Sequence, residues 1–185
     1  MSANKINMTK YDKILITLLL AALCLAGCNV GLPPDVAKLG YVSRPHRFAM
    51  NVPPGWTVQE SGGPAVVIVR APERSGEVRP NVTVTVTPTP PGAALATVVA
   101  GAKQGVGAFR GFKQMSEDSR TLADGRPAHL LTFRQEAFGQ PLVQRQLYAV
   151  AGDRVYTVTA TASPETFASE EPNFETVFRS FRAGW

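Results

Sequence analysis

Two histidines are the first side chains to consider for chemistry in this chain of 185 residues. A histidine pair can bind a metal ion or act as a general base near neutral pH. His46 opens a stretch of alternating residues, and His129 shares a strand face with Leu131 and Phe133. The simpler interpretation places His46 at a strand end on the surface and packs His129 in the core. No His, Asp or Glu cluster has the spacing of metal ligands, so we expect no metal and no cofactor.

Other catalytic patterns are equally weak. Glu170 and Glu171 occupy adjacent helical positions, where their side chains diverge. The chain has no Gly-x-Ser-x-Gly motif. The glycines of Gly105-Val106-Gly107 lack the spacing of a dinucleotide-binding loop and lie at a helix end rather than after a strand. We therefore expect that the protein is not an enzyme and that its function resides in a surface.

A cysteine near the N-terminus has a more specific context. An uncharged apolar run of 12 residues, Ile14 to Leu25, follows Lys10 and Lys13. Its length fits a signal-peptide core of roughly 7–15 residues and falls short of the ~20 that span a bilayer. The run ends in Leu25-Ala26-Gly27-Cys28. This pattern resembles a bacterial lipobox, whose cysteine is lipidated on sulfur and becomes the new N-terminus. An ordinary signal peptide or a short anchor helix is the alternative.

The lipobox interpretation sets an expected address. Residues 1–27 would be removed, residues 28–45 would be the lipidated cysteine and a tether, and residues 46–185 would form a single domain. The cell envelope of a bacterium is then the expected location, lipid-anchored and facing the periplasm or the surface. In enterobacteria-like sorting, Asp after the lipidated cysteine retains a lipoprotein at the inner membrane. Residue 29 is Asn, which by that resemblance favours the outer membrane. Since Cys24 and Cys28 are the only cysteines, the domain would have no disulfide and no cysteine metal site.

The composition excludes few classes of protein, but it limits the kinds of partner that the protein can bind. The net charge is +5, and three lysines of the leader contribute to it. Arginines elsewhere are scattered singly, without the interleaved aromatics of a nucleic-acid surface. We expect no nucleic-acid partner, a membrane contact through the lipid anchor, and one globular core for a chain of this length.

Three adjacent runs predict the centre of the fold. Pro127–Gln135, Leu142–Val150 and Arg154–Thr161 alternate as strands do. Short connections join them, Phe138-Gly139-Gln140-Pro141 and Ala151-Gly152-Asp153. Tight connections between strand-like runs indicate an antiparallel meander.

Further strands are predicted on either side of a helix. Ala65–Val69 is a continuous apolar run, expected to be buried on both faces. Trp56 is expected to close an end of the sheet, with a ligand contact as the alternative. The remaining predicted strands are His46–Val52, half-buried by its alternation, Trp56–Gln59, Val82–Thr87 and Phe112–Thr121.

Two amphipathic helices complete the pattern. Ala93–Phe109 carries an apolar stripe at helical spacing. A second helix is expected after Ser163-Pro164, broken near Pro172, with Asn173 capping its second part. Its stripe consists of Phe174, Val177, Phe178 and Phe181. Four strands, a helix, four strands and a helix predict an α+β fold with an antiparallel β-sheet of about 6–8 strands packed with helices.

Alternating threonines mark a possible interaction surface. They lie at Thr83, Thr85 and Thr87 of one strand and at Thr157, Thr159 and Thr161 of another. If the two strands are adjacent, the threonines form a mildly polar face, thinly covered or exposed. Such a face can accept a partner, although threonine is also ordinary in strands. The loops beside Pro53-Pro54-Gly55 and Phe138-Gly139 are further candidates.

Several motifs together resemble a known family. Tyr41 to Trp56 reads Y-x-x-x-x-x-x-F-x-x-x-V-P-P-G-W, which is similar to the opening of PsbP-like and DcrB-like domains. Later motifs fit the same pattern over residues 41–182: Asn81–Thr87, Gly125–Ala128, Val155–Ala160 and Phe174-x-x-x-Phe178-x-Ser180-Phe181.

The resemblance implies an α/β/α sandwich of the PsbP-like type, in which an antiparallel sheet lies between helical layers. It also implies a non-catalytic domain that binds other proteins. Two functions remain open. One is a lipid-anchored domain that binds or stabilises another envelope protein or complex. The other is a small-ligand-binding or transport-accessory lipoprotein, which would use the space between sheet and helix.

Overall fold

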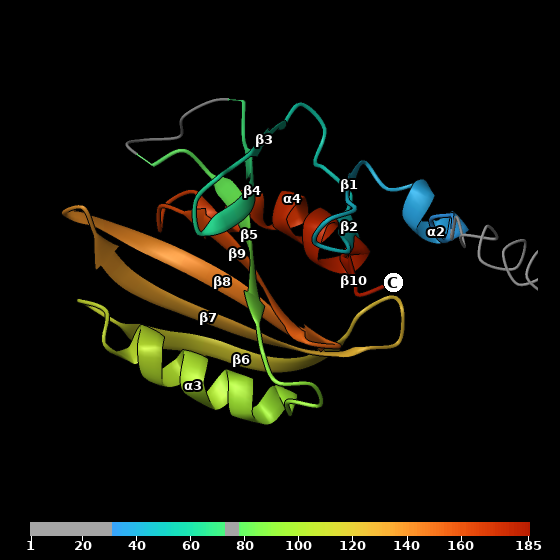
Figure 1. The fold of residues 1–185 in the computed structure, drawn as a ribbon. Helices are drawn as coiled ribbons and strands as arrows, with labels where there is room; N and C mark the ends of the chain where they lie inside the picture. The colour runs from blue at the N-terminus through green and yellow to red at the C-terminus, as the bar shows by residue number, and fades with distance from the viewer. Residues whose placement is uncertain (1–30, 73–77) are drawn as a thin grey trace, which may run out of the picture. The chain divides into compact units, whose positions relative to one another are not determined.

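A computed structural model describes residues 31–72 and 78–185 (Figure 1). The predicted signal peptide, with Leu25, Ala26, Gly27 and Cys28, lies outside the described residues. Residues Pro33–Trp185 form one compact unit. None of the described helices is long and apolar enough to cross a membrane.

An antiparallel sheet of seven strands forms the centre of this unit, in the order β3-β4-β5-β9-β8-β7-β6. The predicted meander is confirmed as three consecutive antiparallel neighbours, and β5 joins it by pairing with β9. The strands are β3 Thr57–Glu60, β4 Ala65–Arg70, β5 Asn81–Pro88, β6 Lys113–Thr121, β7 Pro127–Ala137, β8 Gln140–Ala151 and β9 Arg154–Ala162.

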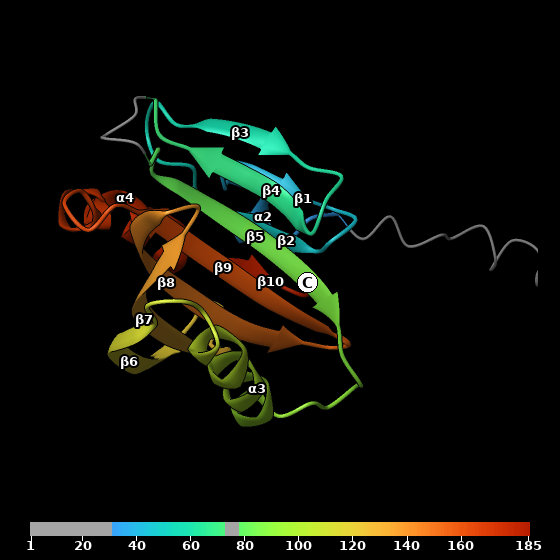
Figure 2. The ribbon, with the colours of Figure 1, turned by 90° about the vertical axis from the view of Figure 1, so that its left-hand side faces the viewer.

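Helices lie on both faces of this sheet (Figures 1 and 2). On one face, α3 (Leu95–Gly107) buries Val99 and Val106 against β7 and β8. On the other face, α4 (Phe167–Ser180) packs its predicted apolar stripe into the main core. The predicted α+β class with a sheet between helical layers is thereby confirmed.

A small second sheet lies beside α4 and contains β1 (Tyr41–Ser43), β2 (Phe48–Met50) and β10 (Arg182–Ala183). β2 is its central strand and pairs with both others. All three β2 residues are buried, so the predicted half-buried alternation of His46–Val52 is wrong. The cause is tertiary packing, because Phe48 stacks on Phe181 at 5.8 Å and meets Tyr156 edge-on.

Part of the stretch predicted to be a tether belongs to the folded unit. Residues 34–43, assigned to that tether, instead form α2 (Pro34–Ala37) and β1. Val36 is buried, and the β1 backbone pairs with β2. Elements of three or four residues are too short to show a periodicity in the sequence. The partners that stabilise them also come from elsewhere in the chain. The folded unit therefore begins near Pro33 rather than at residue 46.

The main core contains most of the large aromatic side chains. Trp56 is 8% exposed and meets the Phe174 ring edge-on at 6.0 Å. Phe174, Phe178 and Phe181 are almost fully buried, as their spacing predicted. Trp56 was predicted to close an end of the sheet, and the structure packs it in the main core against α4.

Two local predictions are wrong. Helix α4 continues through Pro172, and the Asn173 side chain donates to Glu170 inside it, so there is neither a break nor a second cap. Burial of the aromatic stripe outweighs the hydrogen bond that proline removes. In β4, Val67 and Val69 are buried while Ile68 is half-buried, because that face has no helix packed closely on it.

Candidate functional site

The face of the large sheet that carries α3 is only partly covered. α3 packs mainly on β7 and β8, and β9, β5 and β4 continue beyond it (Figure 2). Side chains on that part of the face must therefore meet solvent or a partner, which makes it the first place to look for a site.

The predicted threonines lie together on this face. Thr83 pairs directly with Thr159, and Thr85 pairs with Thr157, across β5 and β9. Thr83, Thr85 and Thr157 are half-buried, while Thr159 is 9% exposed. The two strands are therefore adjacent, as the sequence interpretation required. The threonine side chains on this face are half-buried or buried rather than fully exposed.

A trough occupies one end of this face, where β5 begins and β9 ends. Its volume is about 550 Å³. Polar uncharged side chains dominate its lining, and two arginines and an apolar rim complete it. The lining residues that matter here are Arg70, Arg79, Thr83, Gln135, Phe138, Gln144, Thr159 and Thr161. We call this feature the threonine trough.

The rim of the threonine trough includes an unusual aromatic residue. Phe138 and Gly139 form the two-residue turn between β7 and β8, with φ angles of 54° and 76°. Positive φ at both positions is typical of the turn that joins tight hairpins, where Asn-Gly is the preferred pair. A bulky residue with positive φ is a conformational outlier. The Phe138 side chain is nonetheless fully exposed at 103%.

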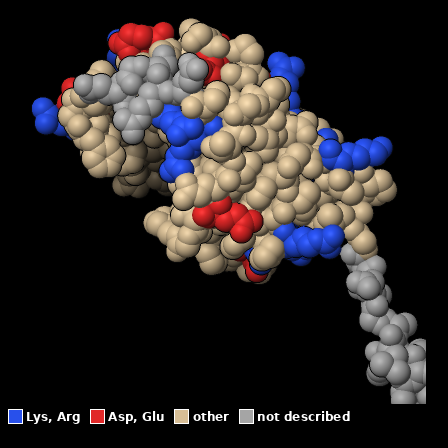
Figure 3. All heavy atoms as spheres, turned by 90° about the horizontal axis from the view of Figure 1, so that it is seen from above, with Lys and Arg blue, Asp and Glu red and all other residues tan. Residues whose placement is uncertain are grey.

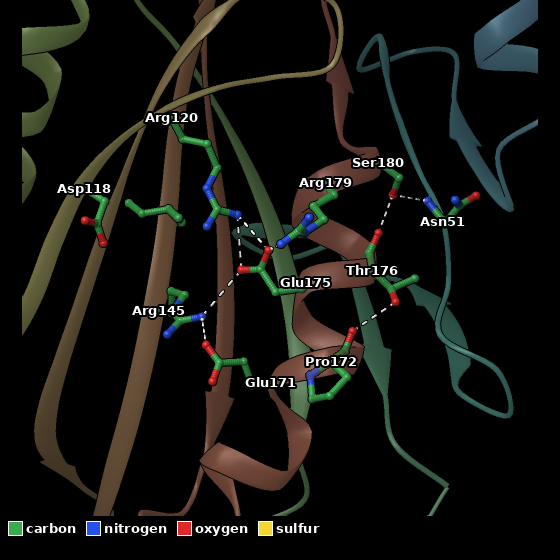
Figure 4. Close-up of a pocket in the computed structure, with 11 residues that line it drawn as sticks. Asn51, Asp118, Arg120, Arg145, Glu171, Pro172, Glu175, Thr176, Arg179 and Ser180 are labelled. Carbon is green, nitrogen blue, oxygen red and sulfur yellow. Dashed lines mark hydrogen bonds and ion pairs between the residues drawn. The ribbon is translucent and has the colours of Figure 1, made fainter.

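A second cavity, of about 960 Å³, lies between α4 and the opposite sheet face (Figure 4). Three arginines converge there on Glu175. Arg120 donates to both carboxylate oxygens at 3.1 and 2.8 Å, and Arg179 donates through Nε at 3.0 Å. Arg145 lies 3.5 Å from Glu175 and donates to Glu171 at 2.8 Å. We call this group the arginine clamp.

The arginine clamp holds its central carboxylate ionised. Burial raises the pKa of Glu175, but hydrogen bonds from Arg120 and Arg179 outweigh burial and keep the pKa below its ordinary value. Arg145 is also fixed by the Phe167 ring, 5.5 Å away, and by donating to Thr132 at 3.1 Å. Because the arginines on β6 and β8 contact carboxylates on α4, the group ties that helix to the sheet.

A third cavity, of about 620 Å³, lies between α3 and strands β6 and β7, and His129 lines it. His129 Nε2 is 3.0 Å from Glu117 Oε1 but is not aligned for a hydrogen bond. Lys103 donates to the same carboxylate at 2.6 Å and is the main cause of the lowered pKa of Glu117. His129 is therefore a packed strand residue beside an ion pair.

The two histidines are not brought together. His46 lies in the turn before β2 and lines a different cavity from His129. Across residues 31–72 and 78–185, no group of three or more His, Cys, Asp or Glu side chains could hold a metal ion. Lys and Arg side chains are dispersed among uncharged and acidic residues on the face that Figure 3 shows.

Sequence reasoning missed the arginine clamp and the role of Gln135. Glu175 and Arg179 stand four positions apart on a helix, which was a usable signal. Arg120 and Arg145 lie far from them in the chain and gave none. Gln135 belongs to a run read as a plain strand, and it lines the same trough as Thr159, with β8 between their two strands.

Fold and surface together define a class, the antiparallel α+β domains of the PsbP-like type. Within it, the DcrB family profile matches residues 49–180, and the chain belongs to the DcrB family. No curated protein sequence matches the chain significantly.

Solved structures show the same fold at low sequence identity. LpqN of Mycobacterium tuberculosis, described as involved in cell envelope biogenesis, is 14% identical with a TM-score of 0.61, over 75% of this chain and 83% of LpqN. The cyanobacterial PsbP protein of Synechocystis is 17% identical with a TM-score of 0.58, over 77% of this chain and 90% of that one. A Pseudomonas aeruginosa protein of unknown function is 18% identical with a TM-score of 0.55, over 65% and 91%.

Proposed function

We propose that this protein is a lipid-anchored component of the bacterial cell envelope whose domain binds another envelope protein or complex without catalysis. The address is supported by the sequence around Cys28, by membership of the DcrB family and by the fold shared with LpqN, which is described as involved in cell envelope biogenesis. The binding surface is the threonine face together with the β7–β8 turn.

The carrying observation is the exposed, conformationally costly Phe138. A side chain in an unfavourable backbone region persists when the surrounding structure holds it, and such positions are concentrated at functional sites. Phe is also one of the residues enriched at protein interfaces relative to the rest of the surface. Phe138 contributes no burial to the folded chain, so contact with a partner is the role that its exposure supports.

The β7–β8 turn lies far from the N-terminal helix of the folded unit. In Figure 1, the β7–β8 turn and α2 lie at opposite ends of the folded unit. The chain runs from α2 back toward Cys28. A protein bound at the turn would thus meet the end of the unit that is distant from α2.

The arginine clamp supports a non-catalytic interpretation of the cavity of about 960 Å³ beside α4. A general acid needs a pKa near the working pH, whereas the pKa of Glu175 is lowered. Arg120 and Arg145 tie α4 to the sheet, and Arg179 pairs with Glu175 within the helix. This cavity therefore serves the fold in our account.

Binding of a small ligand is the second candidate. It is favoured by the cavity beneath α3, whose walls include Leu95 and Val99 and whose far end carries Lys103 and Glu117. Half of its lining residues are apolar and half are polar or charged, and a ligand site usually combines an apolar wall with polar groups that orient the ligand.

Co-purification from native membranes separates the two candidates. The full chain is isolated in mild detergent beside Phe138→Asn, and beside Met115→Asn as a control at another exposed apolar residue, 50% exposed on β6. We expect a stoichiometric protein partner with the wild type and the control, and its loss in Phe138→Asn. A partner retained by Phe138→Asn would contradict the proposal, and a co-purified small molecule without protein would favour the second candidate.

A further inference from the structure

Two buried polar side chains that line the threonine trough have no side-chain hydrogen bond among the described residues. Gln135 and Thr159 are each 9% exposed, and neither side chain makes a hydrogen bond with another described residue. Their neighbours are paired, since Gln144 donates to Thr161 at 3.1 Å. Most buried polar groups are hydrogen-bonded, so unpaired ones that line a trough point to a ligand that completes them.

These two groups remain reachable from the trough. Where the structure describes the chain, the fully enclosed side-chain atoms without a partner are His129 Nε2 and Arg182 Nε. Neither Gln135 nor Thr159 is among them. An amide and a hydroxyl each donate and accept hydrogen bonds. The floor thus fits a ligand that offers donors and acceptors in alternation, as the backbone of an extended segment does.

Charge on the threonine trough has one sign. Its charged lining residues, within the part of the chain that the structure describes, are Arg70 and Arg79. Both side chains are anchored, because Arg79 Nε donates to the Ala71 carbonyl at 2.5 Å and Arg70 donates to Gln59. Fixed positive charge beside a binding floor favours an acidic group on the partner.

The rim offers an apolar counterpart. Val78, Ala137, Phe138 and Leu142 lie around the same trough. Phe138 is free to pack against an aliphatic or aromatic side chain. A single ligand can therefore complement all three parts of the trough. It needs hydrogen-bond donors and acceptors for the floor, a negative charge for the arginines and an apolar group for the rim.

We propose that the threonine trough binds an extended segment of the protein partner. An acidic side chain of that segment faces Arg70 and Arg79, an apolar one packs on Phe138, and its backbone bonds Gln135 and Thr159. This inference rests on the proposed function and specifies the chemistry of the partner. An uncharged glycan is the less suitable occupant, because it leaves the two guanidinium groups without a counter-charge and the apolar rim uncovered.

The test measures the residue preferences of the full chain, in detergent, for an immobilised library of N-acetylated hexapeptides. We expect enrichment of Asp or Glu together with Leu, Ile, Val or Phe. Thr159→Val should weaken all binding at least tenfold. Arg79→Gln should remove the preference for acidic residues and keep the preference for apolar ones. Phe138→Asn should remove the preference for apolar residues and keep the preference for acidic ones.

Matched controls change the same residue types outside the trough. They are Thr121→Val on β6, Arg110→Gln beside Glu136 and Met115→Asn, and each should bind the library as the wild type does. Melting curves show which variants fold, and Arg70→Gln replaces Arg79→Gln if the latter does not.

Three outcomes would overturn the inference. They are no enrichment, the same preferences in the trough variants and the controls, and displacement of the bound peptides by chito-oligosaccharides, which would assign the trough to a glycan. A negative peptide-library result contradicts only this inference if Phe138→Asn still loses its protein partner in the co-purification from membranes. If Phe138→Asn retains that partner, the proposed function itself is contradicted.

Discussion

Glu175 shows how much one carboxylate can organise. It receives hydrogen bonds from arginines on β6 and on its own helix, and it lies within 3.5 Å of a third arginine on β8. Its side chain is 16% exposed. Removing one partner from a buried charge network costs more than the network itself contributes, because the remaining charges lose their compensation.

Glu175→Gln should therefore destabilise the protein. We expect a loss of roughly 1.5–3 kcal/mol at pH 7, the range for a hydrogen bond to a charged group. Urea unfolding of the two proteins measures it. Glu171→Gln is the control, since its side chain is 49% exposed and its loss should matter little.

The same carboxylate predicts a pH dependence. The folded pKa of Glu175 lies below its ordinary 4.5. The stabilisation from its charge is therefore complete above that value and is lost as the pH falls through the folded pKa. The difference in unfolding free energy between wild type and Glu175→Gln should shrink over that acidic range. A difference that is constant down to pH 2 would show that the charge of Glu175 is not involved.

Phe138 predicts an opposition between stability and binding. Asn suits the positive φ of 54° better than Phe, and no burial is lost because Phe138 is fully exposed. Phe138→Asn should raise the stability by about 1 kcal/mol, the scale of the strain that a left-handed conformation imposes. In a domain of this size that corresponds to a melting temperature about 2–4 °C higher. A lower melting temperature would mean that the ring has a role in the fold.

At the scale of elements, the sequence predicted the helices and strands that have a clear periodicity. It did not predict short elements or those stabilised by partners far away in the chain. The meander, the threonine alternation and the stripe of Phe174, Val177 and Phe178 follow from periodicity. Burial reproduces the alternation at the start of β5 and the stripe of α4. Helix α2 and strand β1 were missed because they are stabilised by partners remote in the chain. The prediction of a break at Pro172 failed because packing of the helix outweighed a local preference.

The candidate site was predictable only in part. Alternation identified Thr83 and Thr159, and the turn at Phe138-Gly139 was marked as a loop of interest. The trough itself combines Gln135 of β7 with Arg79 from the segment before β5, and these residues are remote in the chain. The arginine clamp depends on three elements, so no local pattern contains it.

Trp56 and Phe178 test the core that α4 forms with the sheet. Trp56→Ala and Phe178→Ala should each cost about 3–5 kcal/mol, the range for deleting a buried large aromatic side chain. Val58→Ala on edge strand β3, 40% exposed, should be nearly neutral by comparison. Chemical denaturation checks all three. A melting temperature within a degree or two of the wild type for either aromatic variant would contradict its place in the core.

For the whole molecule, the proposed lipid anchor would decide where the binding surface operates. In the proposed function the lipid on the Cys28 sulfur supplies the anchor, so Cys28→Ser should release the protein from membranes or leave it unprocessed. Fractionation with radiolabelled palmitate measures both effects. Equal labelling of the mutant would show that Cys28 is not the lipidated residue.

Photo-crosslinking in intact cells tests the central claim, that this surface binds another envelope protein. A photoreactive amino acid is placed at Phe138 and, as a control, at Met115. The account predicts a protein adduct of discrete mass from position 138, absent from position 115 and abolished by adding Thr159→Lys in the threonine trough. An absence of adducts at position 138, the same adducts from both positions, or an adduct indifferent to Thr159→Lys would contradict it.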